Sequence, residues 1–155
     1  LTTMVQPEVA AGMASTGRAP GSVQLIVPLF TAAGDTEEER ARWREVARMQ
    51  VAFYGSTPNY AFMFEMLDRP GTTQAIRERQ KAGDTKGMAA VIDDDLLAHF
   101  MVESSYDGLA DAVIDRLSGI ADRVVLYMAG MTYRADREGF ARLGAAAREV
   151  VERTS

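Results

Sequence analysis

Three consecutive aspartates close to the only histidine of the chain are the residues best suited to bind a metal ion. A divalent ion needs several ligands that converge on one point, whereas the side chains of the adjacent residues Asp93, Asp94 and Asp95 point in different directions. An aspartate in front of an apolar helix is, in contrast, a favoured N-cap. We therefore interpret Asp93 or Asp94 as a helix cap and assign no metal site. A single histidine, His99, also gives little support to a Ser/His/Asp hydrolase.

The segment Gly55-Ser56-Thr57 is a second candidate, because small residues in a loop can bind phosphate. No strand precedes this segment, and the chain has no G-x-x-x-x-G-K-[ST] pattern, so a phosphate loop is not supported. The sequence instead predicts a joint between two helices, with Thr57 as the cap and Pro58 as the first helical residue.

The composition excludes several classes of function. The chain has 155 residues, a formal net charge of −5 and no cysteine, so disulfides, thiolate chemistry and cysteine-ligated metal sites are excluded. Its arginines alternate with glutamates on predicted helices, which is typical of solvated helix faces and argues against a nucleic-acid partner. No apolar run is long enough to cross a bilayer, so we predict no membrane partner and a cytoplasmic location. The chain opens with Leu1-Thr2-Thr3 rather than methionine, and we expect it to be a fragment.

Apolar spacing and capping signals predict helices that alternate with a few buried strands. Two apolar runs bounded by turns, 22–30 and 123–128, are typical of strands covered on both faces. Pro28 cannot donate a ladder hydrogen bond, so it indicates an edge, a bulge or a strand end. Residues 100–102 are either a short strand or a buried connector. Helices are predicted at 5–16, 35–54, 58–67, 73–81, 85–92, 94–99, 107–119 (capped by Asp107) and 136–153.

Two buried strands that each lead into a helix indicate βαβ construction and an α/β fold that is predominantly helical by residue count. Two or three strands cannot enclose a sheet, and their apolar edges would be left open. Partner strands must therefore come from elsewhere, and the sequence predicts an incomplete domain.

Five segments resemble the luciferase-like family of flavin- and deazaflavin-dependent oxidoreductases, in particular its actinobacterial-type branch that uses coenzyme F420. They follow the order of the family and are residues 12–18 (GMASTGR), 27–39 (VPLFTAAGDTEEE), 53–60 (FYGSTPNY), 87–100 (GMAAVIDDDLLAHF) and 121–127 (ADRVVLY). The resemblance implies the C-terminal part of a (β/α)8 TIM barrel, with 22–30 and 123–128 as its seventh and eighth strands and a helical insertion at 55–105. It also implies that the catalytic residues lie in the missing N-terminal half of the barrel, so none is assigned to this chain.

Barrel active sites lie at the C-terminal ends of the strands, so the resemblance implies cofactor contacts at the ends of the two strands. Apolar side chains there would suit a flat ring system, although the same residues would also simply complete the core. The predicted cofactor-binding residues are Phe30, Thr31, Met128, Ala129 and Gly130.

The insertion helps to cover the barrel mouth in such enzymes, which implies a substrate- or lid-facing role for Tyr54, Ser56 and Tyr60. The turn 103–107 departs from the family, whose members usually have a glycine-threonine-proline type of turn before the seventh helix. Its serine hydroxyls could meet an anion at the helix start. The acidic residues of this turn argue against phosphate, so we interpret it as a cap.

On this resemblance, the parent protein uses a flavin-type cofactor for hydride transfer to or from a small organic substrate, or for its monooxygenation. The expected cofactor is coenzyme F420, a deazaflavin, with FMN second, and the expected assembly is a homo-oligomer. The alternative is a non-catalytic helical module for interaction or oligomerisation. Strands buried on both faces favour the enzyme, because they have no role in a free-standing helical module.

Overall fold

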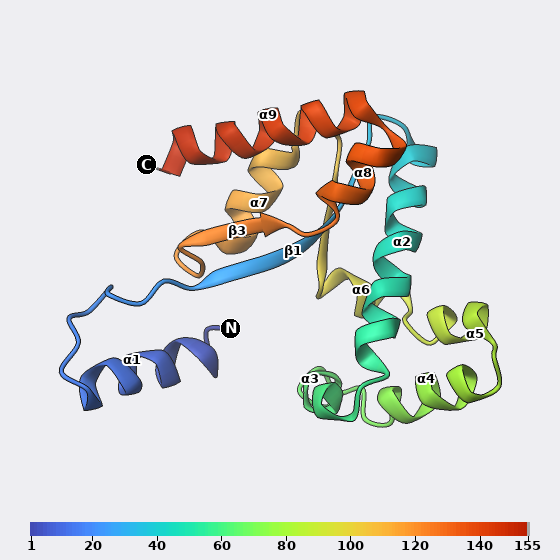
Figure 1. Ribbon diagram of the computed structural model, residues 1–155, viewed down its shortest axis with the longest axis horizontal. Coiled ribbons are helices and arrows are strands. Elements are labelled where there is room, and N and C mark those ends of the chain that lie inside the picture. Colours follow the sequence, from blue (N-terminus) through green and yellow to red (C-terminus); the bar gives the residue numbers. More distant parts are fainter. Residues whose placement is uncertain (155) are drawn as a thin grey trace.

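The computed structural model describes residues 1–154 and consists of helices packed around a small parallel sheet (Figure 1). This arrangement confirms the α/β class predicted from the sequence. In chain order the elements are α1 (Val5–Ser15), β1 (Ile26–Ala33), α2 (Glu37–Gly55), the 3-10 helix η1 (Pro58–Tyr60), α3 (Ala61–Glu65), α4 (Thr72–Lys81), α5 (Thr85–Ala90), α6 (Asp94–Ala98), β2 (Met101–Ser104), α7 (Leu109–Leu117), β3 (Arg123–Leu126), α8 (Ala129–Ala135) and α9 (Arg137–Thr154).

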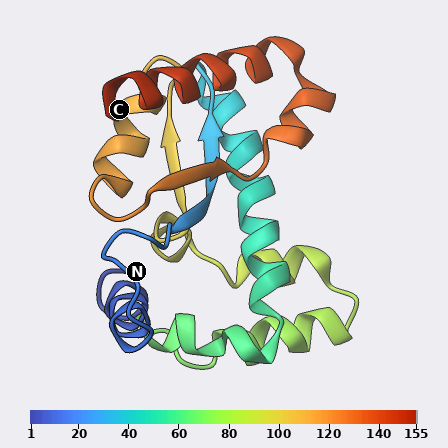
Figure 2. The ribbon, with the colours of Figure 1, turned by 60° about the vertical axis from the view of Figure 1, so that its left-hand side comes forward.

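The three strands are parallel and lie in the order β2-β1-β3. The two outer strands pair with different halves of β1: β2 pairs with residues 30–33 and β3 with residues 26–29. Figure 2 shows β1 in blue, β2 in yellow and β3 in orange. Met101 and Val102 are therefore part of a strand rather than a connector, and Phe100 lies in the turn just before it. Pro28 lies in the half of β1 that pairs with β3, and in this half the opposite edge of β1 has no strand partner among the described residues. This position fits a residue that cannot donate a hydrogen bond.

The strand order bears on the barrel that the resemblance implies. The strands predicted at 22–30 and 123–128 are direct neighbours, as two consecutive barrel strands must be. β2 lies between them in the chain but on the far side of β1 in the sheet. The described residues therefore form an open three-stranded sheet with two free edges, and a closed barrel is not observed.

Two apolar cores lie on opposite faces of the sheet, because successive strand residues point to opposite sides. The first joins the helices α2 to α6 to one face, and the second joins α7 and α9 to the other (Figure 1). The largest fully buried side chains of the first core are Phe64, Ile76, Ile92 and Leu97, and the second is built on Leu29, Val102, Leu109, Val113 and Leu143.

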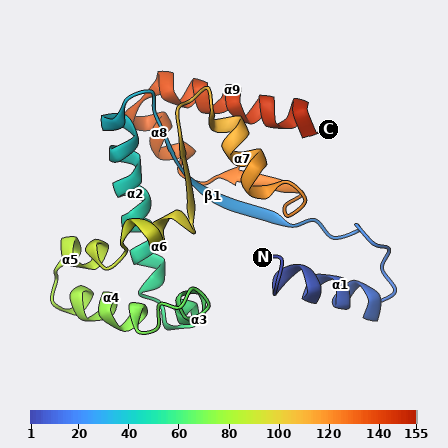
Figure 3. The same ribbon diagram turned by 180° about the vertical axis from the view of Figure 1, so that it is seen from behind.

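Helix α1 is set apart from the rest of the molecule (Figure 3). It has no buried residue, and the amide of Gln6 donates to the carbonyls of Gly119 and Ile120, both at 3.2 Å. Val9 and Met13 on α1 face an open groove of about 960 Å³, whose other wall is formed by α7, α9 and the residues around the start of β3. No helix among residues 1–154 is long and apolar enough to cross a membrane.

The helix caps predicted from the sequence are confirmed where the capping side chain bonds to a backbone N–H a few residues away. Thr36 and Glu39 form a reciprocal capping box at the start of α2. Asp93 caps α6, since its carboxylate accepts from the backbone N–H of Leu96 at 2.8 Å. Asp107 does not cap α7, and the side chain of Thr57 makes no cap hydrogen bond. The cap prediction for Asp107 was therefore wrong, whereas Thr57 does occupy the N-cap position before Pro58, as predicted, without a side-chain bond.

Candidate functional site

Four aromatic side chains from separate parts of the chain meet near the end of β3, and we call them the aromatic cluster. The ring of Tyr127 lies edge-on to Phe30, with centroids 5.2 Å apart, and to Tyr54, with centroids 6.3 Å apart. Tyr60 extends the cluster, 6.4 Å from Tyr54. Tyr60 and Tyr127 remain 40% and 41% exposed as residues, so part of the aromatic cluster is accessible to a ligand.

The register of the sheet places Tyr127 beside Phe30. Strand β3 ends at Leu126, which pairs with Leu29, and the backbone N–H of Tyr127 then donates to the carbonyl of Leu29 at 3.0 Å. Tyr127 thus lies next to the middle of β1 (residues 26–33), where Phe30 points toward the α2 side of the sheet.

The end of α2 and the turn after it supply the other two rings. Tyr54 lies in the last turn of α2, whose end is fixed by Gly55 packed against buried residues. Ser56 donates its hydroxyl hydrogen to the carbonyl of Phe53 at 2.8 Å. The backbone N–H of Tyr60 donates to the Thr57 carbonyl at 3.0 Å, which bends the chain back beside α2.

The hydroxyls of Tyr54 and Tyr127 form a hydrogen bond. This bond, followed by desolvation, raises the pKa of Tyr54, because it stabilises the protonated phenol. The aromatic cluster therefore offers ring faces together with a pair of hydrogen-bonded hydroxyl groups. Such a surface can bind and orient a planar ligand, but it contains no strong base or nucleophile.

The structure thus brings together three of the eight predicted site residues: Phe30, Tyr54 and Tyr60. Thr31 is buried on the other face of β1, in the neighbourhood of Trp43 and Thr132. Met128 is also buried, at 5% exposure, and the hydroxyl of Ser56 is used within its own turn. The last two residues, Ala129 and Gly130, form the first turn of α8.

Tyr127 joins the other members of the cluster but was not among the predicted site residues. Tyr127 lies within the strand predicted at 123–128, and a residue inside a buried strand is expected to belong to the core. The structure ends that strand two residues earlier, at Leu126. Only the pairing of β3 with β1 shows that Tyr127 stands at the strand end.

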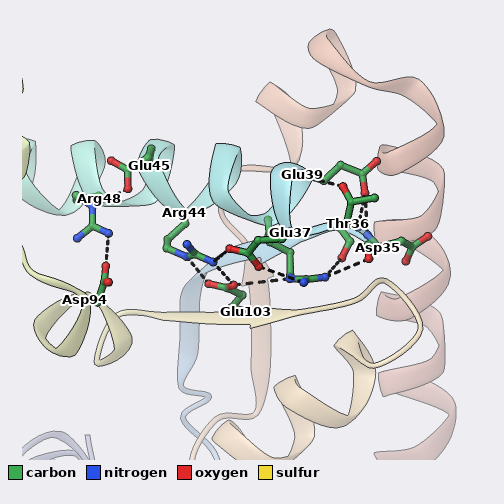
Figure 4. Close-up of polar contacts among 11 residues, drawn as sticks. Asp35, Thr36, Glu37, Glu39, Arg44, Glu45, Arg48, Asp94 and Glu103 are labelled. Carbon is green, nitrogen blue, oxygen red and sulfur yellow. Dashed lines mark hydrogen bonds and ion pairs between the residues drawn. The ribbon is translucent and has the colours of Figure 1, made fainter.

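A second polar group lies beside the C-terminal end of β2 (Figure 4). Arg44 on α2 donates to Glu103 at 2.7 Å through Nε and to Glu37 at 2.8 Å. Arg40 lies 3.8 Å from the carboxylate of Glu103. The hydrogen bond to Glu103 is the main cause of the raised pKa of Arg44, and the bond from Arg44 is the main cause of the lowered pKa of Glu37. Glu103 is therefore paired with arginines and attaches β2 to α2, rather than serving as a free base.

Arg142 on α9 connects the loops that follow β1 and β2. Its guanidinium donates to Asp107 at 2.9 Å, pairs with Asp35, and lies 4.5 Å from the ring centre of Tyr106. Ser105 accepts from the backbone N–H of Gly108 at 3.1 Å. Asp35 and Asp107 at this end of the sheet thus bind an arginine of the same chain, and the turn 103–107, predicted to be a cap, gives no side-chain cap hydrogen bond to α7.

The aspartate run is likewise used within the fold. Arg69 pairs with Asp93 at 3.1 Å, and the guanidinium of Arg48 lies 2.5 Å from Asp94. Among the described residues, no group of three or more histidines, cysteines, aspartates or glutamates has the arrangement of a metal site.

Comparison with known proteins gives the family. The family described as luciferase-like monooxygenase matches residues 2–125. Among curated proteins, the uncharacterized protein Rv1360 of Mycobacterium tuberculosis and the uncharacterized protein Mb1395 of Mycobacterium bovis are each 32% identical over 130 residues. The matched region is 83% of this chain but 38% of either relative, so the chain spans well under half of their length. No solved structure matches the chain. The chain belongs to the luciferase-like monooxygenase family.

Proposed function

We propose that this chain is part of a flavin-type oxidoreductase and that the aromatic cluster contacts the ring system of its cofactor. The cluster carries the proposal, because it gathers residues predicted separately as cofactor-facing and lid-facing at the end of a strand. Ligand sites in parallel α/β folds lie at this end of the strands. Family membership supports flavin chemistry, and coenzyme F420 is favoured over FMN on the motifs of residues 53–60.

The residues present fit a planar ring. Phe30, Tyr60 and Tyr127 offer aromatic surface, and the Tyr54–Tyr127 hydroxyl pair offers a polar edge. When bound, the cofactor would supply hydride transfer to or from a small organic substrate or, with molecular oxygen as co-substrate, its monooxygenation. The chain's own residues bind and orient the ring and cover it from water, and no residue of this chain is assigned a proton-transfer step.

We further propose that these strands belong to a (β/α)8 barrel completed by polypeptide that the longer relatives contain. The direct pairing of β1 with β3 fits their assignment as the last two barrel strands, and the free edges of β2 and β3 offer pairing sites. A homo-oligomer in the cytoplasm is the assembly that we expect, and a chain without cysteine suits that reducing compartment.

A non-catalytic interaction module is the alternative, and one observation favours it. Helix α1 has no buried residue and lies across an open groove of about 960 Å³ with largely apolar walls. Exposed apolar grooves of this kind bind partner segments. In that case the protein binds a polypeptide and has no affinity for flavins.

Titration of the full-length protein with FMN and with coenzyme F420, followed by cofactor fluorescence, tests the proposal. Saturable binding of one cofactor is expected. Tyr60→Ala should weaken this binding by about 2- to 10-fold, because aromatic contacts contribute about 0.5–1.5 kcal/mol each. Tyr133→Ala is the matched control, since Tyr133 is similarly exposed but packs on Phe140 and Arg137, outside the cluster. Binding of neither cofactor by the wild-type protein would refute the proposed function.

A further inference from the structure

The hydroxyl of Tyr127 has hydrogen-bonding capacity that the fold does not use. A phenol can donate one hydrogen bond and accept others. Within residues 1–154, the hydroxyl of Tyr127 makes one hydrogen bond, to the hydroxyl of Tyr54. Either hydroxyl can donate in this bond, and in one of the two arrangements Tyr54 is the donor and Tyr127 the acceptor. In that arrangement the proton of Tyr127 remains available to a third group.

The ring of Tyr127 is held in place from two sides. Phe30 contacts it edge-on at an interplanar angle of 83°, and Tyr54 contacts it at 64°. The backbone of Tyr127 is fixed by its hydrogen bond to Leu29. A donor fixed in this way loses little conformational freedom when a ligand binds, so more of its interaction energy appears as affinity.

The surroundings favour a neutral acceptor. The pKa of Tyr54 is shifted by its bond with Tyr127, by desolvation and by Tyr60, and no charged residue among those that the structure describes contributes. A phosphate or carboxylate would therefore find no counter-charge beside the hydroxyl pair, whereas a carbonyl oxygen needs none. A phenol that already accepts a hydrogen bond is also a stronger donor, because bonds in a chain polarise one another.

We propose that Tyr127, supported by Tyr54, donates a hydrogen bond to a carbonyl oxygen on the edge of a planar ring ligand, and so selects rings that carry such an oxygen. The inference rests on the proposed function and adds to it a named donor, a named positioning residue and a ligand feature. Tyr127 touches the ligand in this scheme, whereas Tyr54 acts through Tyr127.

Dissociation constants of the full-length protein for FMN, riboflavin and coenzyme F420 test the inference with three single variants and one double variant. Tyr127→Phe should weaken binding by about 2- to 10-fold, the range for one neutral hydrogen bond. Tyr54→Phe should have a smaller effect, and it should have none when Tyr127 is already phenylalanine. Tyr133→Phe is the control and should bind as the wild type does.

Riboflavin distinguishes the ring from the phosphate. Equal weakening by Tyr127→Phe for riboflavin and FMN supports a contact with the ring, whereas a loss confined to FMN means a phosphate contact and overturns the inference. Unchanged binding by Tyr127→Phe, or an undiminished Tyr54→Phe effect in the double variant, also overturns it. If the wild-type protein binds none of the three compounds, the proposed function fails first and the inference fails with it.

A spectroscopic titration without any ligand tests the hydroxyl pair itself. Phenolate absorbance of the five tyrosines is recorded against pH. Two tyrosines of the wild type should ionise at a pH above the other three, because the pKa of Tyr54 is raised by its bond with Tyr127 and the pKa of Tyr106 is raised by burial. Tyr127→Phe should lower the pH at which one of these two ionises, because Tyr54 then loses its acceptor, and should leave the other unchanged. An identical titration of the four remaining tyrosines in Tyr127→Phe would show that the pair does not form, and the inference would be wrong.

Discussion

The end of α2 depends on a glycine for packing rather than for backbone freedom, and this makes Gly55→Ala informative. A methyl group added at Gly55 would lie 2.7 Å from Cζ of Phe64 and 3.0 Å from Cδ1 of Ile76. Both neighbours are fully buried, at 1% and 0% exposure, so neither side chain can turn toward solvent. The added methyl group must therefore displace the end of α2 or distort the first core.

Two opposing effects determine how much Gly55→Ala changes the free energy of unfolding. Overpacking of a core costs about 1–3 kcal/mol. Replacing glycine by alanine within a helix gains about 0.5–1 kcal/mol. The first term is larger here because both contacts are with buried carbon atoms, so we expect a net loss of about 1–2 kcal/mol of stability. For a chain of this size, that loss lowers the melting temperature by about 2–8 °C.

Urea denaturation followed by circular dichroism measures the change, and Gly144→Ala is the matched control. A methyl group at Gly144, inside α9, would meet only the end of the Arg148 side chain at 3.8 Å. This variant should therefore gain about 0.5–1 kcal/mol of stability. The argument fails if Gly55→Ala is as stable as the wild type, or if both variants shift in the same direction.

Two further predictions concern charged residues. Arg48→Met should lower the free energy of unfolding, measured in urea, by about 1–3 kcal/mol, because the buried guanidinium of Arg48 donates to the Ile92 carbonyl. Arg69→Met is the control: it removes an exposed ion pair and should cost less than about 1 kcal/mol. The pKa of Asp35 is lowered, chiefly by its hydrogen bond with Arg142, so this pair stabilises the fold above the ordinary carboxyl pKa of 3.8 and the contribution is lost as the pH falls below it. Asp35→Asn should flatten the fall in melting temperature between pH 5 and about pH 3, and equal slopes for the two proteins would contradict this.

The sequence predicts those features of the fold whose causes are local. The start of α2 is one example, because Thr36 and Glu39 carry both halves of a capping box within four residues. The cap of Asp107 fails for the opposite reason. Its carboxylate is bound by Arg142, thirty-five residues away, and no local pattern indicates that competition.

The candidate site shows the same limit. Phe30, Tyr54 and Tyr60 could each be selected from the sequence, but their meeting around Tyr127 depends on which residue of β1 faces the end of β3. Strand register is set by pairing between residues nearly one hundred positions apart. A sequence pattern with period two fixes which face a side chain takes, and it does not fix which residue of the neighbouring strand lies beside it.

The strand order is the point on which both the aromatic cluster and the barrel assignment depend. The assignment of β1 and β3 as the last two barrel strands requires them to be neighbours, and the structure pairs them directly. If β2 were itself a barrel strand, chain order would instead place it between β1 and β3. Adjacent strands lie about 4.8 Å apart, and inserting β2 would double that distance. Phe30 and Tyr127 would then be separated, and the Tyr54–Tyr127 bond would no longer lie against β1.

Paired cysteines decide between the two orders in the full-length protein, and the chain has no cysteine of its own to interfere. Val27 and Val124 are direct partners in the sheet, so Val27→Cys with Val124→Cys should form a disulfide on mild oxidation, because the spacing of adjacent strands falls within the range that a disulfide spans. Thr31→Cys with Val102→Cys is the positive control, since β1 and β2 are neighbours in either order. If only the control pair closes, β2 separates the two strands and the aromatic cluster cannot be the cofactor surface. If both pairs close, the order β2-β1-β3 holds in the intact protein and the cluster stands at the end of two adjacent strands.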